Sequence, residues 1–249
     1  EVNIAEKLEA ADGGDAPVAP YSCRDTVTSV LEFARTLGQR TPASGRPHLL
    51  AIGGDHSIAY MNIRAAWERA GSDTRGLALL HFDAHLDTVD SVWGERWGHA
   101  SPFIRAIEEG CIDPERMISI GIRGPLNTAT DLDFARRHGI NVVTVDRLSR
   151  GDGHEAIETF RRRVEDAPLY VSIDIDCLDP AFAPGTGTPC CGGLSTRELF
   201  GLLRRFAGAN LCGADIVEVL PDRDVAGITA LTASHLVLEV LALAARRRT

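Results

Sequence analysis

The sequence lacks the cysteine spacings of a zinc site. Its six cysteines include no C-x-x-C pair, and the adjacent Cys190 and Cys191 match no zinc-binding pattern. Without such a framework, the default expectation is reduced thiols in a cytosolic enzyme. We therefore predict a cytoplasmic location.

Long apolar runs and targeting signals are also missing. We expect no stretch that is apolar over the roughly 20 residues that a bilayer-spanning helix needs, and no segment resembles a signal peptide. We expect no membrane partner.

Basic residues are outnumbered, with Lys+Arg 26 against Asp+Glu 35 and a net charge of -9. This balance argues against nucleic acid as a partner and is compatible with a small cationic substrate. At 249 residues and 44% hydrophobic, the chain is long enough for one large domain with a substantial core. No repeat, low-complexity stretch or linker divides it, so we predict a single catalytic domain over residues 1–249.

Apolar strands alternate with helical segments along most of the chain, after an irregular stretch at 1–20. Strands that are apolar throughout and separated by helices indicate a mainly parallel sheet covered on both faces, which is an α/β fold. The predicted strands are 48–52, 77–82, 117–122, 141–145, 169–175 and 214–220, and the predicted helices are 24–37, 57–70, 101–109, 131–138, 154–164, 196–206 and 228–246.

Polar clusters follow four of these strands, at residues 52–57, 83–87, 172–180 and 218–221. Open α/β sheets bind their ligands beyond the carboxyl ends of the strands. A single cluster could be turn chemistry, because Asp and Gly favour turns. Four on one sheet edge indicate a functional site.

The second cluster contains Asp83, His85 and Asp87. On an extended chain, residues two apart point to the same face, so the three side chains would converge. A solvated strand end is the alternative, but two carboxylates and an imidazole on one face are a suitable divalent-metal site.

Asp174 and Asp176 are expected to share a face in the same way, and His56 follows the first predicted strand. Together, these candidate ligand residues outnumber the four ligands of a closed zinc site and suit two metals that share carboxylates. Its oxygen-rich composition favours Mn²⁺ over Zn²⁺. The candidate ligands are His56, Asp83, His85, Asp87, Asp174 and Asp176.

These motifs resemble the ureohydrolase family, which includes arginase, agmatinase and guanidinobutyrase. The resemblance covers nearly the whole chain. It implies an arginase-like three-layer α/β/α sandwich and a homo-oligomer, trimer or hexamer. The matching stretches are GGDHS at 53–57, DAHLD at 83–87, GHASPF at 98–103, SIDIDCLDPAFAPGTGTP at 172–189, DIVEVLPDRD at 215–224 and GITA at 227–230.

The resemblance also implies two Mn²⁺ ions per subunit. His56, Asp83, Asp87 and Asp174 would hold one ion, and Asp83, His85, Asp174 and Asp176 the other, with Asp83 and Asp174 bridging. Asp179 would orient a ligand, or else it is a turn residue before Pro180. His81 is expected on the opposite face of its strand, either supporting a ligand or packed in the core.

The chemistry follows from the weak electrophilicity of a guanidinium carbon, whose attack at neutral pH needs water activated by metals. Asp87 would orient that water and take its proton. His99 would protonate the leaving amine, unless it is a capping or core histidine. Glu218 would accept hydrogen bonds from the guanidinium, unless it is a paired carboxylate at a strand end. The products would be urea and an amine.

Substrate selection is expected in residues 88–98, which lack the arginase pattern and look more like agmatinases and guanidinobutyrases. Asp90 and Glu95 could attract the distal amine of agmatine, whereas Arg96 could pair with the carboxylate of 4-guanidinobutyrate. Each could instead form a surface ion pair. We predict agmatine, giving putrescine, with a guanidino acid such as 4-guanidinobutyrate as the alternative.

The sequence departs from the family at Leu86 and at Cys190–Cys191. The family also normally has a strand and a loop before a stretch that begins here at Asp12, so we expect the chain to lack that segment. An inactive metal-binding scaffold subunit is therefore the alternative from another class. A deacetylase-like hydrolase would need fewer metal carboxylates and a catalytic histidine pair, which the sequence does not offer.

Overall fold

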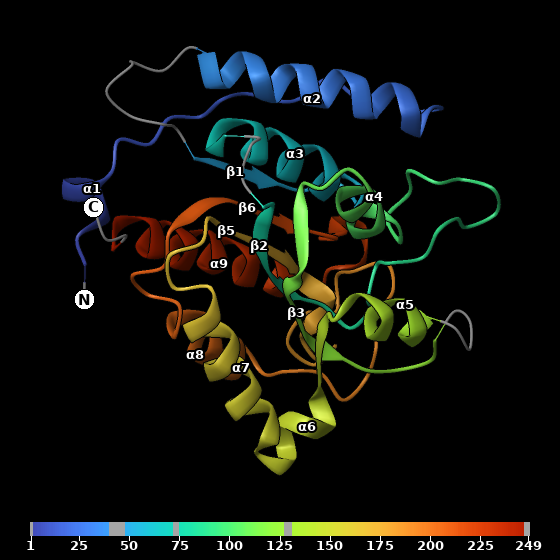
Figure 1. Cartoon of the computed structure of the whole chain (residues 1–249), viewed down its shortest axis with the longest axis vertical. Helices are drawn as coiled ribbons and strands as arrows, with labels where there is room; N and C mark the ends of the chain where they lie inside the picture. The colour runs from blue at the N-terminus through green and yellow to red at the C-terminus, as the bar shows by residue number, and fades with distance from the viewer. Residues whose placement is uncertain (1, 40–47, 72–74, 127–130, 247–249) are drawn as a thin grey trace.

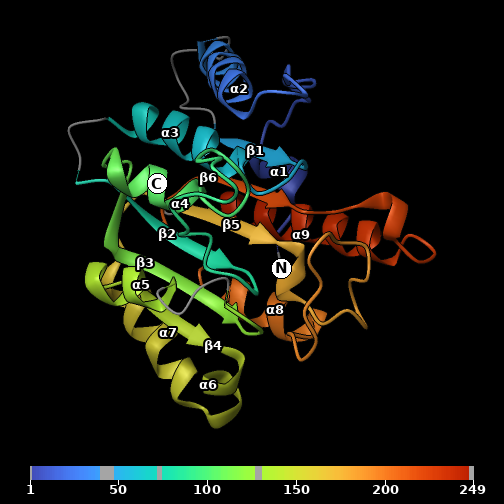
Figure 2. The ribbon, with the colours of Figure 1, turned by 90° about the vertical axis from the view of Figure 1, so that its right-hand side faces the viewer.

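A parallel β-sheet lies at the centre of the computed structural model, which describes residues 2–39, 48–71, 75–126 and 131–246 (Figure 1). Within these ranges the sheet has six strands in the order β1-β6-β5-β2-β3-β4, and every adjacent pair is parallel (Figure 2). The strands are β1 (Leu49–Ile52), β2 (Leu77–Phe82), β3 (Ile112–Ile122), β4 (Asn141–Thr144), β5 (Leu169–Asp174) and β6 (Leu211–Val217).

Helices cover both faces of the sheet (Figure 1). One face carries α3 (Ile58–Ala70), α4 (Pro102–Glu108) and α5 (Asp131–His138), with α2 (Cys23–Gln39) packed on the outside of α3. The other carries α7 (Asp152–Arg163), α8 (Thr196–Arg204) and α9 (Ile228–Ala245).

Side chains of β2 pack into the hydrophobic cores on both faces of the sheet. Leu77 and Leu79 belong to the core under α3, whereas Leu80 and Phe82 belong to the core under α8 and α9. Alternate residues of a strand point to opposite faces, so a strand buried on both sides is apolar throughout. The predicted three-layer α/β/α sandwich is confirmed.

Some boundaries of helices and strands differ from the predictions, because polar residues interrupt the apolar pattern on which the predictions rest. β3 begins at Ile112, five residues before its predicted start, and β6 ends at Val217 rather than at 220. The helices α1 (Ile4–Lys7) and α6 (Val145–Arg150) were not predicted. α6 starts where Thr144 Oγ1 accepts the backbone N–H of Arg147, a side-chain cap that ends β4.

Helix α9 is apolar nearly all round. Its 18 residues have a mean hydropathy of 1.8, so by length and composition alone it could cross a membrane, contrary to the sequence prediction. In the fold, however, Leu236, Val240 and Leu243 are buried in the core against the sheet. Leu231 and Leu238 lie exposed on its outer side. We interpret α9 as a core helix with an apolar outer face.

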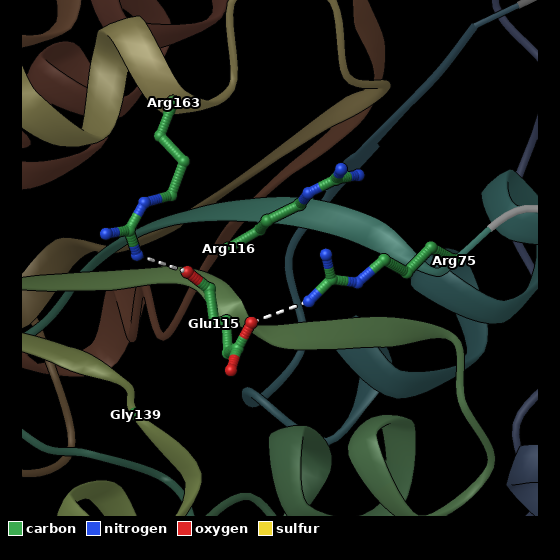
Figure 3. A pocket seen from close by; sticks show the side chains of 5 residues that line it. All are labelled: Arg75, Glu115, Arg116, Gly139 and Arg163. Carbon is green, nitrogen blue, oxygen red and sulfur yellow. Dashed lines mark hydrogen bonds and ion pairs between the residues drawn. The ribbon is translucent and has the colours of Figure 1, made fainter.

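An open hollow lies at the amino-terminal edge of the sheet, beside the starts of β3 and β4 (Figure 3). Its charged side chains already take part in hydrogen bonds and ion pairs. Arg75 Nη2 lies 2.6 Å from Glu115 Oε2, and Arg163 Nη1 donates to the Glu115 carbonyl at 3.0 Å (Figure 3). The candidate site lies at the opposite, carboxyl-terminal edge.

Candidate metal centre

Four strands deliver polar side chains to the carboxyl edge of the sheet. β2 and β5 are neighbours in the sheet and end at Phe82 and Asp174, and β6 lies next to β5. The turn after β1, which contains Gly53 and Gly54 with φ of 79° and 78°, carries His56 to the same place. Positive φ favours glycine, so this turn depends on those two residues.

A first cluster surrounds the imidazole of His56. Its Nδ1 lies 2.8 Å from Asp87 Oδ2, 3.1 Å from Asp83 Oδ2 and 3.4 Å from Asp174 Oδ2. This nitrogen is buried and, among the described residues, has no well-aligned hydrogen bond. Ligand atoms around an octahedral cation with bonds of about 2.1 Å are about 3 Å apart, so the cluster fits a divalent ion.

A second cluster lies beside it. His85 Nδ1 lies 3.0 Å from Asp176 Oδ2 and 3.3 Å from Asp83 Oδ1. The two oxygens of Asp83 thus face different imidazoles, which is the geometry of a bridging carboxylate. Asp174 faces His56 with Oδ2, while its Oδ1 accepts the Asp176 backbone N–H at 2.7 Å. Bridging by Asp174 stays a prediction.

The pKa values of these side chains are shifted because the side chains are buried close to other charged groups. Burial and the neighbouring carboxylates raise the pKa of Asp174 well above its ordinary value. Burial alone would raise the pKa of Asp83, but hydrogen bonds with three histidines hold it well below that value. Burial acts to lower the pKa of His85, yet hydrogen bonds with Asp176 and Asp83 raise it to about 11. Without cations, protons balance the negative charge.

A buried relay behind His56 was not predicted. His56 Nε2 lies 2.9 Å from Ser172 Oγ, and Ser172 Oγ donates to Asp215 Oδ1 at 2.6 Å. Tyr170 OH donates to the other Asp215 oxygen at 2.7 Å. These contacts direct Nδ1 of His56 toward the carboxylates, as outer groups do for metal-binding histidines. The available signal was a charged residue, Asp215, inside an otherwise apolar strand.

His81 corrects one prediction. Its Nε2 lies 2.9 Å from Asp83 Oδ2 and its Nδ1 3.0 Å from Ser119 Oγ, so it does not face away from the site. Residues 81 and 83 are two apart and share a face as β2 ends. His56, His81 and Asp83 are close enough to hold an ion. Because both His81 nitrogens already have partners, we interpret His81 as supporting Asp83.

The segments that carry the predicted ligands Asp87 and Asp176 are turns, not the extended chain used to predict the convergence. Asp87 has a φ of 51°, and Asp176 lies in the 3-10 turn η1 (Ile175–Cys177). Glu218, which follows β6, has a φ of 66°. Non-glycine residues rarely adopt such angles, and strained backbone of this kind is concentrated at functional sites. The convergence was predicted correctly for an incorrect reason.

His99 and Glu218 lie at the rim of the clusters. His99 Nδ1 is 3.8 Å from Glu218 Oε1, and the His99 side chain is 53% exposed. Glu218 Oε1 accepts the backbone N–H of His56, and burial raises the pKa of Glu218. An exposed imidazole beside a buried carboxylate can exchange protons with solvent.

The residues predicted to select the substrate mostly contact one another. Asp90 pairs with Arg96 at 3.1 Å and with the buried Arg105. Glu95 Oε1 accepts the Trp97 backbone N–H at 2.7 Å. Asp90 and Arg96 thus form the surface ion pair named as the alternative.

The glycine-rich stretch at 185–188 lies beside these groups. Thr188 Oγ1 donates to Asp176 Oδ2 at 3.2 Å, and Leu220 N donates to the Gly185 carbonyl at 2.8 Å. A Cβ on Gly187 would lie 3.7 Å from Glu218 Oε2. This stretch therefore forms a loop beside Asp176 and Glu218.

Comparison with known proteins identifies the family. The protein-family model described as "Arginase family" matches residues 1–243 of the chain. The chain belongs to the arginase family. This membership confirms the family resemblance and the expectation of an arginase-family hydrolase.

Relatives of this arginase-family chain include a guanidinopropionase from Pseudomonas aeruginosa, 41% identical over 96% of the chain and 72% of the relative. An agmatinase from Chromobacterium violaceum is 38% identical over 96% of the chain and 69% of the relative. Among solved structures, proclavaminate amidino hydrolase from Streptomyces clavuligerus matches with a TM-score of 0.89 and 38% identity, covering 99% of this chain and 79% of that one.

Proposed function

We propose that the chain is a binuclear manganese hydrolase of guanidino compounds. The supporting observation is the pair of clusters that share Asp83, one around His56 and the other around His85. When bound, two divalent cations acidify water and so supply a nucleophile at neutral pH. One ion would be held by His56, Asp83, Asp87 and Asp174, and the other by Asp83, His85, Asp174 and Asp176.

Each proposed catalytic residue has a different role at the guanidinium end of the substrate. Glu218 accepts N–H groups of the guanidinium, whose planar donors match a carboxylate. Asp87, next to His56, orients the attacking water and accepts its proton. His99 gives a proton to the departing alkylamine, which is too basic to leave as an anion.

Acidic side chains near the rim favour agmatine as the substrate. Glu95 lies close to the segment that carries His99, because a Cβ on the neighbouring Gly98 would lie 3.7 Å from Glu95 Cγ. Burial, and to a smaller extent the charge of Asp55, raises the pKa of Glu218 at the site. The basic Arg96 is engaged with Asp90 instead. We therefore propose recognition of the distal ammonium of agmatine by Glu95, with urea and putrescine as products.

A guanidino acid is the second candidate, because the relative that is 41% identical is a guanidinopropionase. In that case Arg96 would leave Asp90 and bind the substrate carboxylate. The two candidates differ in the charge at the distal end of the substrate.

Urea release separates the candidates. Protein loaded with Mn²⁺ would be assayed with agmatine, 4-guanidinobutyrate, 3-guanidinopropionate and arginine, and its metal content measured. Asp174→Asn should abolish the activity, whereas Asp146→Asn, at an exposed carboxylate paired with Arg150, should not. Metal-dependent urea from agmatine supports the first candidate. Two bound ions without urea from any substrate would favour the inactive scaffold.

We also propose that the chain forms a cytoplasmic homo-oligomer, trimer or hexamer, of single-domain subunits. The exposed Leu231 and Leu238 on α9 support self-association, because exposed apolar surface commonly marks interfaces. Light scattering should give the mass of an oligomer, and Leu238→Lys should reduce it. A monomeric wild-type protein would contradict this proposal.

A further inference from the structure

Arg123 follows β3 and binds a group of backbone carbonyls. Nη2 donates to the carbonyls of Asp176, Leu178 and Cys190 at 2.7, 3.0 and 2.6 Å. Nη1 donates to those of Gly121 and Cys177 at 3.1 and 3.2 Å, and Nε donates to that of Cys190 at 3.1 Å. One half-buried guanidinium thus holds five carbonyls from three separate segments of the chain.

This arrangement needs arginine in particular. A guanidinium carries five N–H donors in a rigid planar fork, so it can reach acceptors on several sides. A lysine ammonium has three donors at a single point and cannot span the same carbonyls. Hydrogen bonds from a charged donor are also stronger than neutral ones.

Four of the five carbonyls, those of Asp176, Cys177, Leu178 and Cys190, lie on the two limbs of one loop. The loop leaves the turn that carries Asp176 and returns at Leu194, where Asp179 N donates to the Leu194 carbonyl at 2.9 Å. Asp179 Oδ2 accepts the N–H groups of Gly192 and Gly193 at 2.7 and 3.2 Å, which supports the turn role for Asp179. Arg123 therefore lies at the base of this loop, residues 179–193.

Two glycines allow the close approach. A Cβ on Gly193 would lie 2.5 Å from Arg123 Nη2 and 2.4 Å from Asp179 N. A Cβ on Gly124 would lie 2.3 Å from Cys190 Sγ. Contacts this short do not occur with real side chains, so both positions require glycine. The sequence is adapted to bring the loop base against the guanidinium.

We propose that Arg123 is a positioning residue for the second cation cluster and for the substrate end of the site. It fixes the backbone of Asp176, whose carboxylate faces His85. It also fixes the base of the loop whose Thr188 contacts Asp176. The inference rests on the proposed function, because it assigns Asp176 to a cation.

The test compares Arg123→Met and Arg123→Lys with the wild type. Arg147→Met is the matched control, because Arg147 is also half-buried and donates to a backbone carbonyl, that of Val142, at 2.7 Å. Stepwise Mn²⁺ binding to the metal-free protein would be measured against a competing chelator. Hydrogen exchange would be followed in residues 177–194, and kcat and KM with the best substrate.

We expect Arg123→Met to weaken binding of the second ion about 10- to 100-fold, as loss of outer groups does at other metal sites. Binding of the first ion should be much less affected. Amides in 177–194 should exchange faster, KM should rise, Arg123→Lys should be intermediate, and Arg147→Met should behave as wild type. A role limited to stability would lower the melting temperature without changing these quantities.

Wild-type affinity for both ions and wild-type exchange in folded Arg123→Met would overturn the inference. If that variant does not fold, Arg123→Lys is decisive, since weaker binding of the second ion supports the inference and unchanged binding overturns it. A wild-type protein that binds no second ion would instead refute the proposed function.

Discussion

The backbone amide of His56 donates a hydrogen bond to the carboxylate of Glu218, 2.7 Å away and 162 residues later in the chain. This bond joins the turn after β1 to the end of β6. It holds Glu218 Oε1 in place and leaves Oε2 beside Gly187. Glu218 can therefore receive a substrate without first reorganising.

Glu218→Gln should lower kcat/KM about 10- to 100-fold, because a hydrogen bond to a charged group contributes about 1.5–3 kcal/mol. The amide oxygen can still accept the His56 N–H, so metal content should not change. Steady-state kinetics and metal analysis test this together. Glu108→Gln, an exposed carboxylate on α4, is the control, and an unchanged kcat/KM in Glu218→Gln would exclude the assigned role.

His99→Asn should reduce kcat about 10²- to 10⁴-fold, the usual contribution of a general acid. Its side chain is 53% exposed, so the melting temperature should stay near that of the wild type. Added imidazole should restore part of the rate. A variant that retains full kcat would show that the leaving amine takes its proton elsewhere.

Metal binding should release protons. Burial acts to lower the pKa of His56 and His85, but the aspartates that face them outweigh it, raising the pKa of His85 to about 11 and that of His56 well above its ordinary value. Both imidazoles therefore carry protons at neutral pH in the metal-free protein, and a cation must displace them. Mn²⁺ affinity should consequently increase with pH.

Calorimetry in two buffers with different ionisation enthalpies counts the released protons. We expect about one proton for each imidazole that becomes a ligand. His85→Asn should release fewer. Binding without proton release would contradict the assignment of these histidines.

Ser172→Ala should weaken Mn²⁺ binding about 10- to 100-fold, because Ser172 links His56 to Asp215. It also removes one donor to a fully buried carboxylate, which should lower the free energy of unfolding by about 1–3 kcal/mol. Chelator competition and denaturant unfolding separate the two effects. Ser149→Ala, at an exposed helical position, should change neither.

Sequence patterns predicted the fold because burial on both faces makes each strand apolar throughout, as in β2. They also predicted where His56, Asp83 and Asp174 would meet, since the carboxyl ends of parallel strands share one edge. Segments such as α6 escaped prediction because a side-chain cap, not apolar periodicity, determines where they begin.

The partners of Arg123 and Asp215 could not be predicted from local patterns, although a charged residue inside an apolar strand marked Asp215 as unusual. Each acts through partners distant in sequence, and an isolated Arg or Asp gives no sign of which carbonyls or hydroxyls it will reach. The pairing of Asp90 with the buried Arg105 was hidden, because a charged side chain in a loop binds whichever opposite charge the fold brings closest. His81 was misplaced although the alternation along β2 puts it on the same face as Asp83.

The pairing of the first strand with the last also affects how the protein is made. β1 forms its ladder with β6, from Leu49 with Gly213 to Ile52 with Ile216. During synthesis, the turn that carries His56 leaves the ribosome long before the strand that anchors it. In the nascent chain, β1 and the turn after it therefore have no fixed neighbour on this side until β6 emerges and inserts between β1 and β5.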